Sequence, residues 1–142
     1  MSRLDRDTYY LNIAKAVSKR SSCLKRQYGC VIVKNDEIIA TGYNGSPRGE
    51  KNCCDIGQCD RLHEVHNFGN YNFCKSVHAE QNALISASRV EMLDSVLYLY
   101  GEENGEEIEC SPCPICQRMI QNAGIKRVVC SNRFNLVQLG ST

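Results

Sequence analysis

The sequence predicts an α/β fold in which helices cover both faces of one sheet that contains some parallel strand pairing. Three observations lead to this prediction. The chain of 142 residues is long enough for one domain with its own hydrophobic core. Two β-rich runs lie close together near the N-terminus, and helix and strand patterns alternate in the second half.

The first half predicts one helix followed by a hairpin. The helix falls within residues 8–20, just after two aspartates, and its apolar side chains recur at helical spacing. These apolar residues are Tyr10, Ile13, Ala14 and Val17. Residues 28–33 and 37–43 are rich in β-branched side chains and predict two strands, with a tight turn at Asn35-Asp36 between them.

The second half predicts two further helices and two strands. In chain order we expect a helix over 78–88, a strand over 95–100, an acidic loop over 101–109, a helix over 114–123 and a strand over 125–130. Gly124 is placed to end the second of these helices. Cys30 and Cys130 lie within apolar runs, so we expect them to fill the core.

Residues 44–75 form an insert with no helical or strand period, within the single domain expected over 1–142. The insert is rich in Gly, Asn, Cys and His. It is too long for an ordinary loop, so something other than an apolar core must order it.

Charge disfavours a polynucleotide partner. The net charge is +1, and residues 1–34 carry eight Lys and Arg against two Asp, whereas residues 35–110 carry five against fourteen acids. The broad basic surface that supplies affinity for nucleic acid is therefore missing. A small anionic ligand near the N-terminal basic cluster is compatible with this pattern.

Cysteine usage favours a metal centre. No apolar leader follows Met1 and no run approaches the roughly 18 apolar residues of a membrane span, so we expect a cytoplasmic protein with no membrane partner. Ten cysteines in a reducing compartment are better explained by metal binding or catalysis than by disulfides.

Two expected helix starts carry metal-ligand side chains. Pro112 and Pro114 flank Cys113 where a helix should begin, and Cys116 follows three residues later, so both sulfurs can point the same way. The helix N-terminus favours thiolates there. If His78 at the start of the other helix faces them, one imidazole and two thiolates suit a zinc ion with an open fourth position, as in catalytic zinc sites.

Glu80 lies two residues after His78, where its carboxylate can reach a water molecule at that open position. Zinc lowers the pKa of bound water from ~15.7 toward ~7, and the carboxylate can take and return a proton. This combination suits hydrolytic removal of an amino group from an electron-poor ring carbon.

Other uses of these cysteines fit less well. Cys110, Cys113 and Cys116 have the spacing of an iron–sulfur run, but that pattern requires a Cys where Ile120 stands. A zinc ribbon has no use for Glu80, and a redox CxxC pair does not need a histidine.

Five motifs resemble those of one enzyme family. HAE at 78–80 with PCPIC at 112–116 resembles the zinc signature of the cytidine-deaminase superfamily. RSSC at 20–23, TGYNGSP at 41–47 and CKSVHAEQNA at 74–83 narrow the resemblance to deoxycytidylate (dCMP) deaminases. It covers roughly residues 9–129.

The resemblance implies a three-layer α-β-α sandwich around a five-stranded mixed sheet, with zinc on His78, Cys113 and Cys116 and with Glu80 as acid and base. It implies conversion of dCMP to dUMP and ammonia, which feeds dTMP synthesis. It also implies a homo-oligomer, a hexamer above all, activated by dCTP and inhibited by dTTP with Mg²⁺. The nucleotide contacts transferred to this chain are Asn44, Gly45, Ala79 and Arg26. Asn44 as a simple turn residue, and Arg26 as a surface charge, stay open.

The resemblance further implies a second, structural zinc that would order the insert. The ligands we expect are Cys23, Cys53, Cys59 and Cys74, with Cys54, His63 and His66 as rivals.

Two departures from the family put substrate choice in doubt. The acidic loop over 101–109 is longer than the tight turn of many relatives. The chain also ends eleven residues after Ser131, so we expect the last element to be short or missing. Alternatives therefore stay open: dCTP, or both dCMP and dCTP, as substrate; another small amino-heterocycle; or a zinc-binding regulatory module without turnover.

Overall fold

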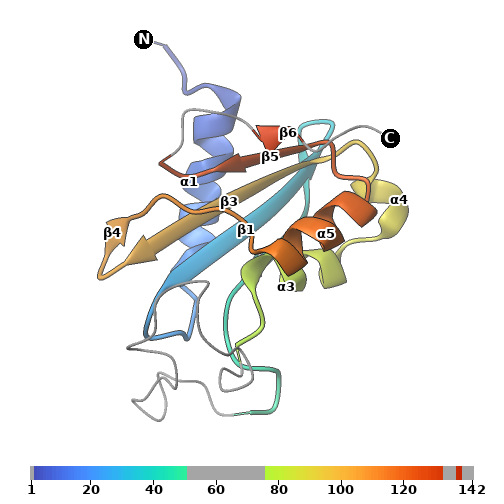
Figure 1. Ribbon diagram of the computed structural model, residues 1–142. Coiled ribbons are helices and arrows are strands. Elements are labelled where there is room, and N and C mark those ends of the chain that lie inside the picture. The colour runs from blue at the N-terminus through green and yellow to red at the C-terminus, as the bar shows by residue number, and fades with distance from the viewer. Residues whose placement is uncertain (1, 51–75, 133–136, 139–142) are drawn as a thin grey trace.

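A computed structural model describes residues 2–50, 76–132 and 137–138, and a mixed sheet forms its centre (Figure 1). The strands are β1 (Gln27–Lys34), β2 (Glu37–Tyr43), β3 (Val96–Glu103), β4 (Glu106–Glu107), β5 (Arg127–Cys130) and β6 (Val137–Gln138). Their order is β2-β1-β3-β5-β6, and β4 pairs with the end of β3. β3 and β5 run parallel, whereas the other pairs are antiparallel.

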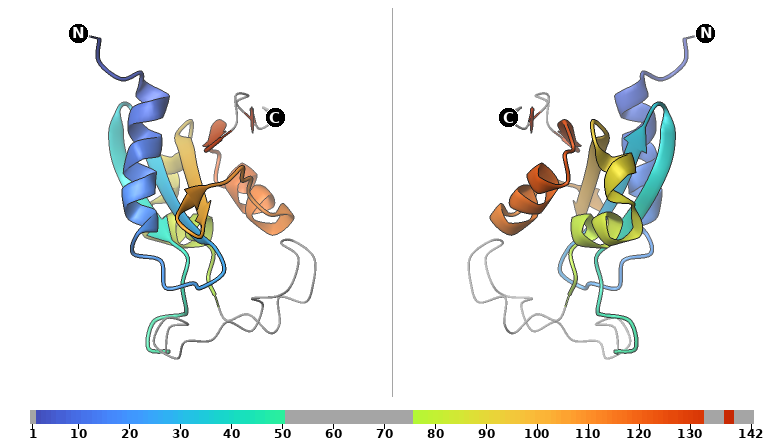
Figure 2. Two further views of the ribbon diagram at one scale, coloured as in Figure 1. Left: turned by 90° about the vertical axis from the view of Figure 1, so that its left-hand side faces the viewer. Right: turned by 90° about the vertical axis from the view of Figure 1, so that its right-hand side faces the viewer.

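Helices lie on both faces of this sheet. They are α1 (Arg6–Ser18), α3 (Ala79–Ser86), α4 (Arg89–Met92) and α5 (Pro114–Asn122). Figure 2 shows α1 on one side of the sheet and α3 with α5 on the other. The predicted α/β sandwich with a five-stranded mixed sheet is confirmed, and β4 is an addition to it. No helix in the described ranges has the length and apolarity to cross a membrane.

Two apolar layers hold the sandwich together. Along β1, Cys30 and Ile32 point to α3 and α5, whereas Val31 and Val33 point to α1, as expected from the two-residue alternation of a strand. Both faces of the sheet are therefore covered, which explains why its central strands are apolar almost throughout. The predicted core positions Cys30 and Cys130 are 0% and 2% exposed.

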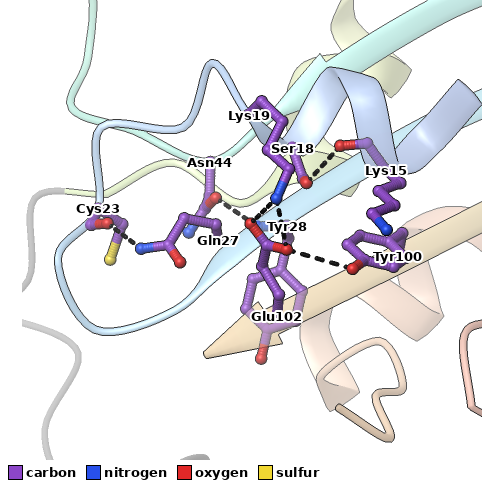
Figure 3. Close-up of polar contacts among 9 residues, drawn as sticks. All are labelled: Lys15, Ser18, Lys19, Cys23, Gln27, Tyr28, Asn44, Tyr100 and Glu102. Carbon is purple, nitrogen blue, oxygen red and sulfur yellow. Dashed lines mark hydrogen bonds and ion pairs between the residues drawn. The ribbon is translucent and has the colours of Figure 1, made fainter. Parts of the chain in front are cut away.

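Tyrosine and carboxylate side chains fasten α1 to the sheet. The Tyr98 hydroxyl donates to Asp7 Oδ1 at 2.8 Å. Lys19 Nζ lies 2.7 and 2.8 Å from the two carboxylate oxygens of Glu102, and the Tyr100 hydroxyl donates to the same carboxylate at 3.2 Å (Figure 3). Burial raises the pKa of Tyr100 to about 12, so its hydroxyl keeps the proton that it donates. The C-terminal end of α1 is thus fixed over the end of β3.

The prediction of a plain loop over 101–109 is wrong. β3 continues to Glu103, and Glu106 pairs with it across the two-residue turn Asn104-Gly105. Both turn residues have positive φ, 54° and 80°, as a tight hairpin turn requires. The acidic strands lack apolar alternation, so the Asn-Gly pair was the one local signal for this hairpin.

The helix predicted over 78–88 is shorter and is followed by a separate one. α3 ends at Ser86, and Ala87 adopts extended backbone angles. Ser88 then caps α4, accepting a hydrogen bond from the Glu91 N–H at 3.3 Å. A serine followed three residues later by a glutamate is a start signal for a new helix, and it explains the break.

Candidate metal centre and catalytic site

Two helix N-termini hold the predicted metal ligands in place. His78 is the N-cap of α3, and its backbone N–H donates to Gln81 Oε1 at 2.9 Å. Cys113 is the N-cap of α5, where its Sγ accepts a hydrogen bond from the Cys116 N–H at 3.4 Å. Pro114 occupies the first turn of that helix, where its fixed φ suits the start of a helix. Each ligand therefore sits at a position that the local sequence itself defines.

The three ligand side chains converge, although they come from separate helices. His78 Nδ1 lies 3.6 Å from Cys113 Sγ and 3.4 Å from Cys116 Sγ. All three ligand atoms lie within 4.8 Å of one another. Ligands of a tetrahedral zinc ion, with bonds of about 2.0–2.3 Å, stand roughly 3.5–3.8 Å apart, so both distances from His78 Nδ1 suit zinc.

The thiol pair is prepared for a cation. Hydrogen bonds from Cys116 and then from His78 lower the pKa of the Cys113 thiol, and the amides at the N-terminus of α5 favour the same charge. The hydrogen bond to Cys113, together with burial, raises the pKa of Cys116. The pair thus carries one negative charge on its own, and a metal ion displaces the remaining proton because it binds thiolates.

Glu80 lies beside these ligands and away from the surface. It belongs to the first turn of α3 and is only 5% exposed. Burial raises the pKa of this carboxyl group above the usual value, and the group interacts with the Cys116 thiol. The carboxylate is therefore held next to the metal ligands without occupying the third ligand position, which His78 fills.

Comparison with known proteins identifies the family. Residues 4–132 match the family described as the cytidine and deoxycytidylate deaminase zinc-binding region. The chain belongs to this family. It is 39% identical over 131 residues to a deoxycytidylate deaminase of Schizosaccharomyces pombe, an alignment that covers 92% of this chain. It is 37% identical over 132 residues to a deoxycytidylate deaminase of Mycobacterium phage D29, covering 91% of this chain and 96% of that enzyme.

A solved structure agrees with this placement in the deaminase family. The dCMP deaminase of cyanophage S-TIM5, crystallised with dCMP and dUMP, superposes with a TM-score of 0.61 at 31% identity, over 90% of this chain and 83% of that one. The resemblance to hydrolytic dCMP deaminases predicted from the motifs is confirmed. This chain spans 38% of the length of the S. pombe enzyme.

Asn44, predicted to contact a nucleotide, has a clear structural role. Its Oδ1 accepts hydrogen bonds from the Ser21 hydroxyl at 2.6 Å and from the Tyr28 N–H at 2.8 Å. Its Nδ2 donates to the Arg26 carbonyl at 2.9 Å. The side chain thereby holds the segment after α1, and the start of β1, against the end of β2. Figure 3 shows Asn44 next to Tyr28. Its contact with a nucleotide stays a prediction.

Gly45 and Ala79, two other predicted nucleotide contacts, both lie near His78. Ala79 is its neighbour in the sequence, and Gly45 is near it in space. Gly45 pairs with Val77, through backbone hydrogen bonds of 3.2 and 2.7 Å, one residue before His78. A side chain at Gly45 would meet Ser22 Oγ at 2.7 Å. Ala79 follows His78 directly and is 1% exposed. Their contact with a nucleotide also stays a prediction.

Tyr28 and Cys110 are neighbours of Glu80 that the sequence analysis did not assign to the site. Both interact electrostatically with Glu80. The Tyr28 ring packs over Gly101, where an added Cβ would lie 2.7 Å from Tyr28 Cε1 and 3.4 Å from Cys110 Cβ. Tyr28 shares its sheet face with Cys30. Because side chains two residues apart along a strand share a face, the position of Tyr28 relative to Cys30 was the sequence signal that could have placed Tyr28 at the site.

Arg26, the fourth predicted nucleotide contact, precedes Tyr28 by two residues. Its guanidinium interacts with the Tyr28 side chain and with the Glu103 carboxylate. Its Nε stands 3.5 Å from Glu103 Oε1, and the two side chains are 24% and 38% exposed. A basic group is thus present near the site, and an acidic group faces it.

The second zinc site predicted from the resemblance stays a prediction. Cys23 is half-buried between α1 and β1, and its carbonyl accepts a hydrogen bond from Gln27 Nε2 at 2.5 Å. The other residues proposed as ligands or rivals lie outside the described residues: Cys53, Cys54, Cys59, His63, His66 and Cys74.

Gly42 fixes the distance between α3 and the sheet, and replacing it should damage the site. A Cβ at Gly42 would lie 2.5 Å from the backbone nitrogen of Ala83 and would also clash with the carbonyl oxygen of Ala79. We expect Gly42→Ala to push the first turn of α3 outward, to lower zinc content and to destabilise the fold by about 1–3 kcal/mol. Elemental analysis and thermal unfolding measure these effects.

Gly29→Ala is the matched control for this change. A Cβ at Gly29 would lie 2.6 Å from the backbone nitrogen of Ser18, so it disturbs α1 on the opposite face of the sheet. Gly29→Ala should lower stability by a similar amount while zinc content stays at the wild-type level. Equal loss of zinc in both variants would contradict the role given to Gly42.

Proposed function

We propose that this chain hydrolyses dCMP to dUMP and ammonia and so supplies dUMP for dTMP synthesis. The observation that carries the proposal is the convergence of His78, Cys113 and Cys116, with Glu80 buried beside them. A chain 37% identical along nearly its full length, that of phage D29, is a deoxycytidylate deaminase. The donor set and the family thus favour the same chemistry.

His78 Nδ1 and the two thiolates would hold the zinc ion. When bound, zinc supplies a water molecule acidic enough to act as a nucleophile near neutral pH. Glu80 would take one proton from the attacking water and deliver it to the ring nitrogen next to the carbon under attack. It would then carry the second proton of that water to the amino group, which leaves as ammonia while the carbon keeps the oxygen as a carbonyl. Glu80 is 5% exposed, and Tyr28 and Cys110 are neighbours that interact with its carboxylate electrostatically.

A panel of substrates tests the proposal directly. Zinc-loaded protein is incubated with dCMP, dCTP, deoxycytidine and guanine in parallel, and ammonia release is measured. We expect dCMP to give the highest kcat/KM. Faster turnover of dCTP would select the alternative substrate, and faster turnover of guanine would select another amino-heterocycle. No ammonia from any compound, with zinc fully bound, would favour a zinc-binding regulatory module.

Arg26 and Lys25 supply positive charge for the substrate phosphate in this proposal. We expect the double variant Lys25→Gln/Arg26→Gln to raise the KM for dCMP about tenfold, the effect of losing a charge-assisted hydrogen bond. Deoxycytidine, which has no phosphate, is the control, and its KM should change little. Equal increases for both substrates would place the phosphate elsewhere.

The effector and assembly predictions are part of the same proposal. A groove of about 820 Å³ lies beside β2 and α3, large enough for a nucleotide. Its lining includes Arg20, Arg48, Gly45 and Tyr43. We propose that dCTP activates and dTTP inhibits with Mg²⁺, in a cytoplasmic homo-hexamer. Titration of activity with each effector and sedimentation of the protein with and without them test this part.

A further inference from the structure

We propose that Glu103 restricts the number of phosphates that the site accepts, because its carboxylate opposes the charge of Arg26 on the sheet face that carries the metal ligands. This inference rests on the proposed function. It assigns a specificity role to the acidic hairpin formed by residues 101–109.

The strand register places Arg26 and Glu103 on the face of the sheet that carries the metal ligands. Along β1, Tyr28 packs with the core layer under α3 and α5, so Arg26, two residues earlier, projects to the same side. Along β3, Leu99 belongs to that layer, and Glu103 follows it at an even spacing. Gln27 pairs with Glu102, which sets Arg26 opposite Glu103 across the two strands.

The ion pair between Arg26 and Glu103 is a long one. Arg26 Nε is 3.5 Å from Glu103 Oε1, and among the described residues no acceptor forms a hydrogen bond with this buried nitrogen. The guanidinium carries further N–H donors besides Nε, and these can still bind an anion. Tyr28 and Glu103 both interact with the guanidinium, so the group is already oriented.

Glu102, the neighbouring acid, does not share this task. It points to the opposite face, where both of its oxygens bind Lys19 Nζ at 2.7 and 2.8 Å. Glu103 is thus the acid of β3 that faces Arg26. A monophosphate can share Arg26 with one carboxylate, whereas the added charges of a triphosphate meet stronger repulsion from Glu103, which grows in proportion to ligand charge.

Glu103→Gln tests this proposal because it removes the charge and keeps the shape. We measure kcat/KM for deoxycytidine, dCMP, dCDP and dCTP. The variant should favour dCTP over dCMP about fivefold more than the wild type does, an effect expected for two extra charges at roughly 8 Å in water. The value for dCDP should lie between them, and that for deoxycytidine should stay unchanged. The gain should shrink in high salt.

Glu107→Gln is the matched control, because it removes the same charge from the same hairpin but on the other face of the sheet. Glu107 pairs with Glu102 in the strand register and is exposed. In this control, the ratio of kcat/KM for dCTP to kcat/KM for dCMP should change less than twofold relative to the wild type. An unchanged ratio in Glu103→Gln, or the same gain in both variants, would overturn the proposal.

Nucleotide binding separates this inference from the proposed function. Calorimetric titration of dCMP and dCTP is repeated in a Glu80→Gln background, with and without Glu103→Gln. If the wild type releases no ammonia from any substrate, the proposed function fails. The binding ratio then still decides the role of Glu103: a shift toward dCTP supports it, and no shift refutes it.

Discussion

Glu80→Gln will lower kcat by about 10²–10⁴-fold while zinc content and the unfolding temperature stay near the wild-type values, since that range is typical of losing a positioned acid and base. The carboxylate lies in the first turn of α3, where it is buried and interacts with the Cys116 thiol. Glutamine keeps the shape of the side chain but cannot take a proton. The measurements are dCMP turnover, elemental analysis and thermal unfolding.

Glu37→Gln provides the comparison for that variant. It makes the same chemical change at an exposed position that begins β2. Its turnover should equal that of the wild type. If Glu80→Gln also turned over dCMP at the wild-type rate, the proton transfer assigned to Glu80 would be wrong, whatever the state of the zinc.

Cys113→Ala will lose the catalytic zinc and all measurable deamination. Alanine removes one of three ligands, and it also removes the sulfur that accepts the Cys116 N–H at the start of α5. Losing the cap alone costs roughly 1 kcal/mol, and losing the metal removes further folding free energy. Cys116→Ala should behave in the same way. Elemental analysis of purified protein, with activity measured in parallel, tests both variants.

Cys30→Ala is the control for the cysteine variants. Cys30 is fully buried near Glu80 but belongs to the core, so its replacement should lower stability and leave the zinc in place. If Cys113→Ala kept the zinc content of the wild type, the assignment of Cys113 as a metal ligand would be wrong.

The number of zinc ions per chain also tests the predicted second metal site. Two ions per wild-type chain, of which Cys113→Ala removes one, would support that site. A single ion per wild-type chain that is lost in Cys113→Ala would refute the second site.

The positions of the metal ligands could be predicted because they depend on local signals. Proline beside Cys113 marks a helix start, and the two-residue spacing from His78 to Glu80 is a chemical pattern. Both helix starts are where the sequence predicts them, within one residue. Whether the two would face each other depends on the packing of α3 and α5 on the same side of the sheet, which the sequence pattern left open.

The features that the sequence analysis missed depend on contacts between distant residues. The hairpin after β3 is made of acidic side chains, so apolar periodicity could not detect it. Tyr28 becomes part of the site because Gly101 on the neighbouring strand leaves room for its ring. The amide of Asn44 is used by three groups from the segment after α1, and its position in a glycine-flanked motif indicated only a turn.

His78 and Cys113 are both the residues at which helices begin and the residues that would grip the cation. Binding of the ion would therefore tie the first turns of α3 and α5 to each other, in addition to the local caps that already define each helix start. The cofactor would act as a clamp between two helices that lie far apart in the chain.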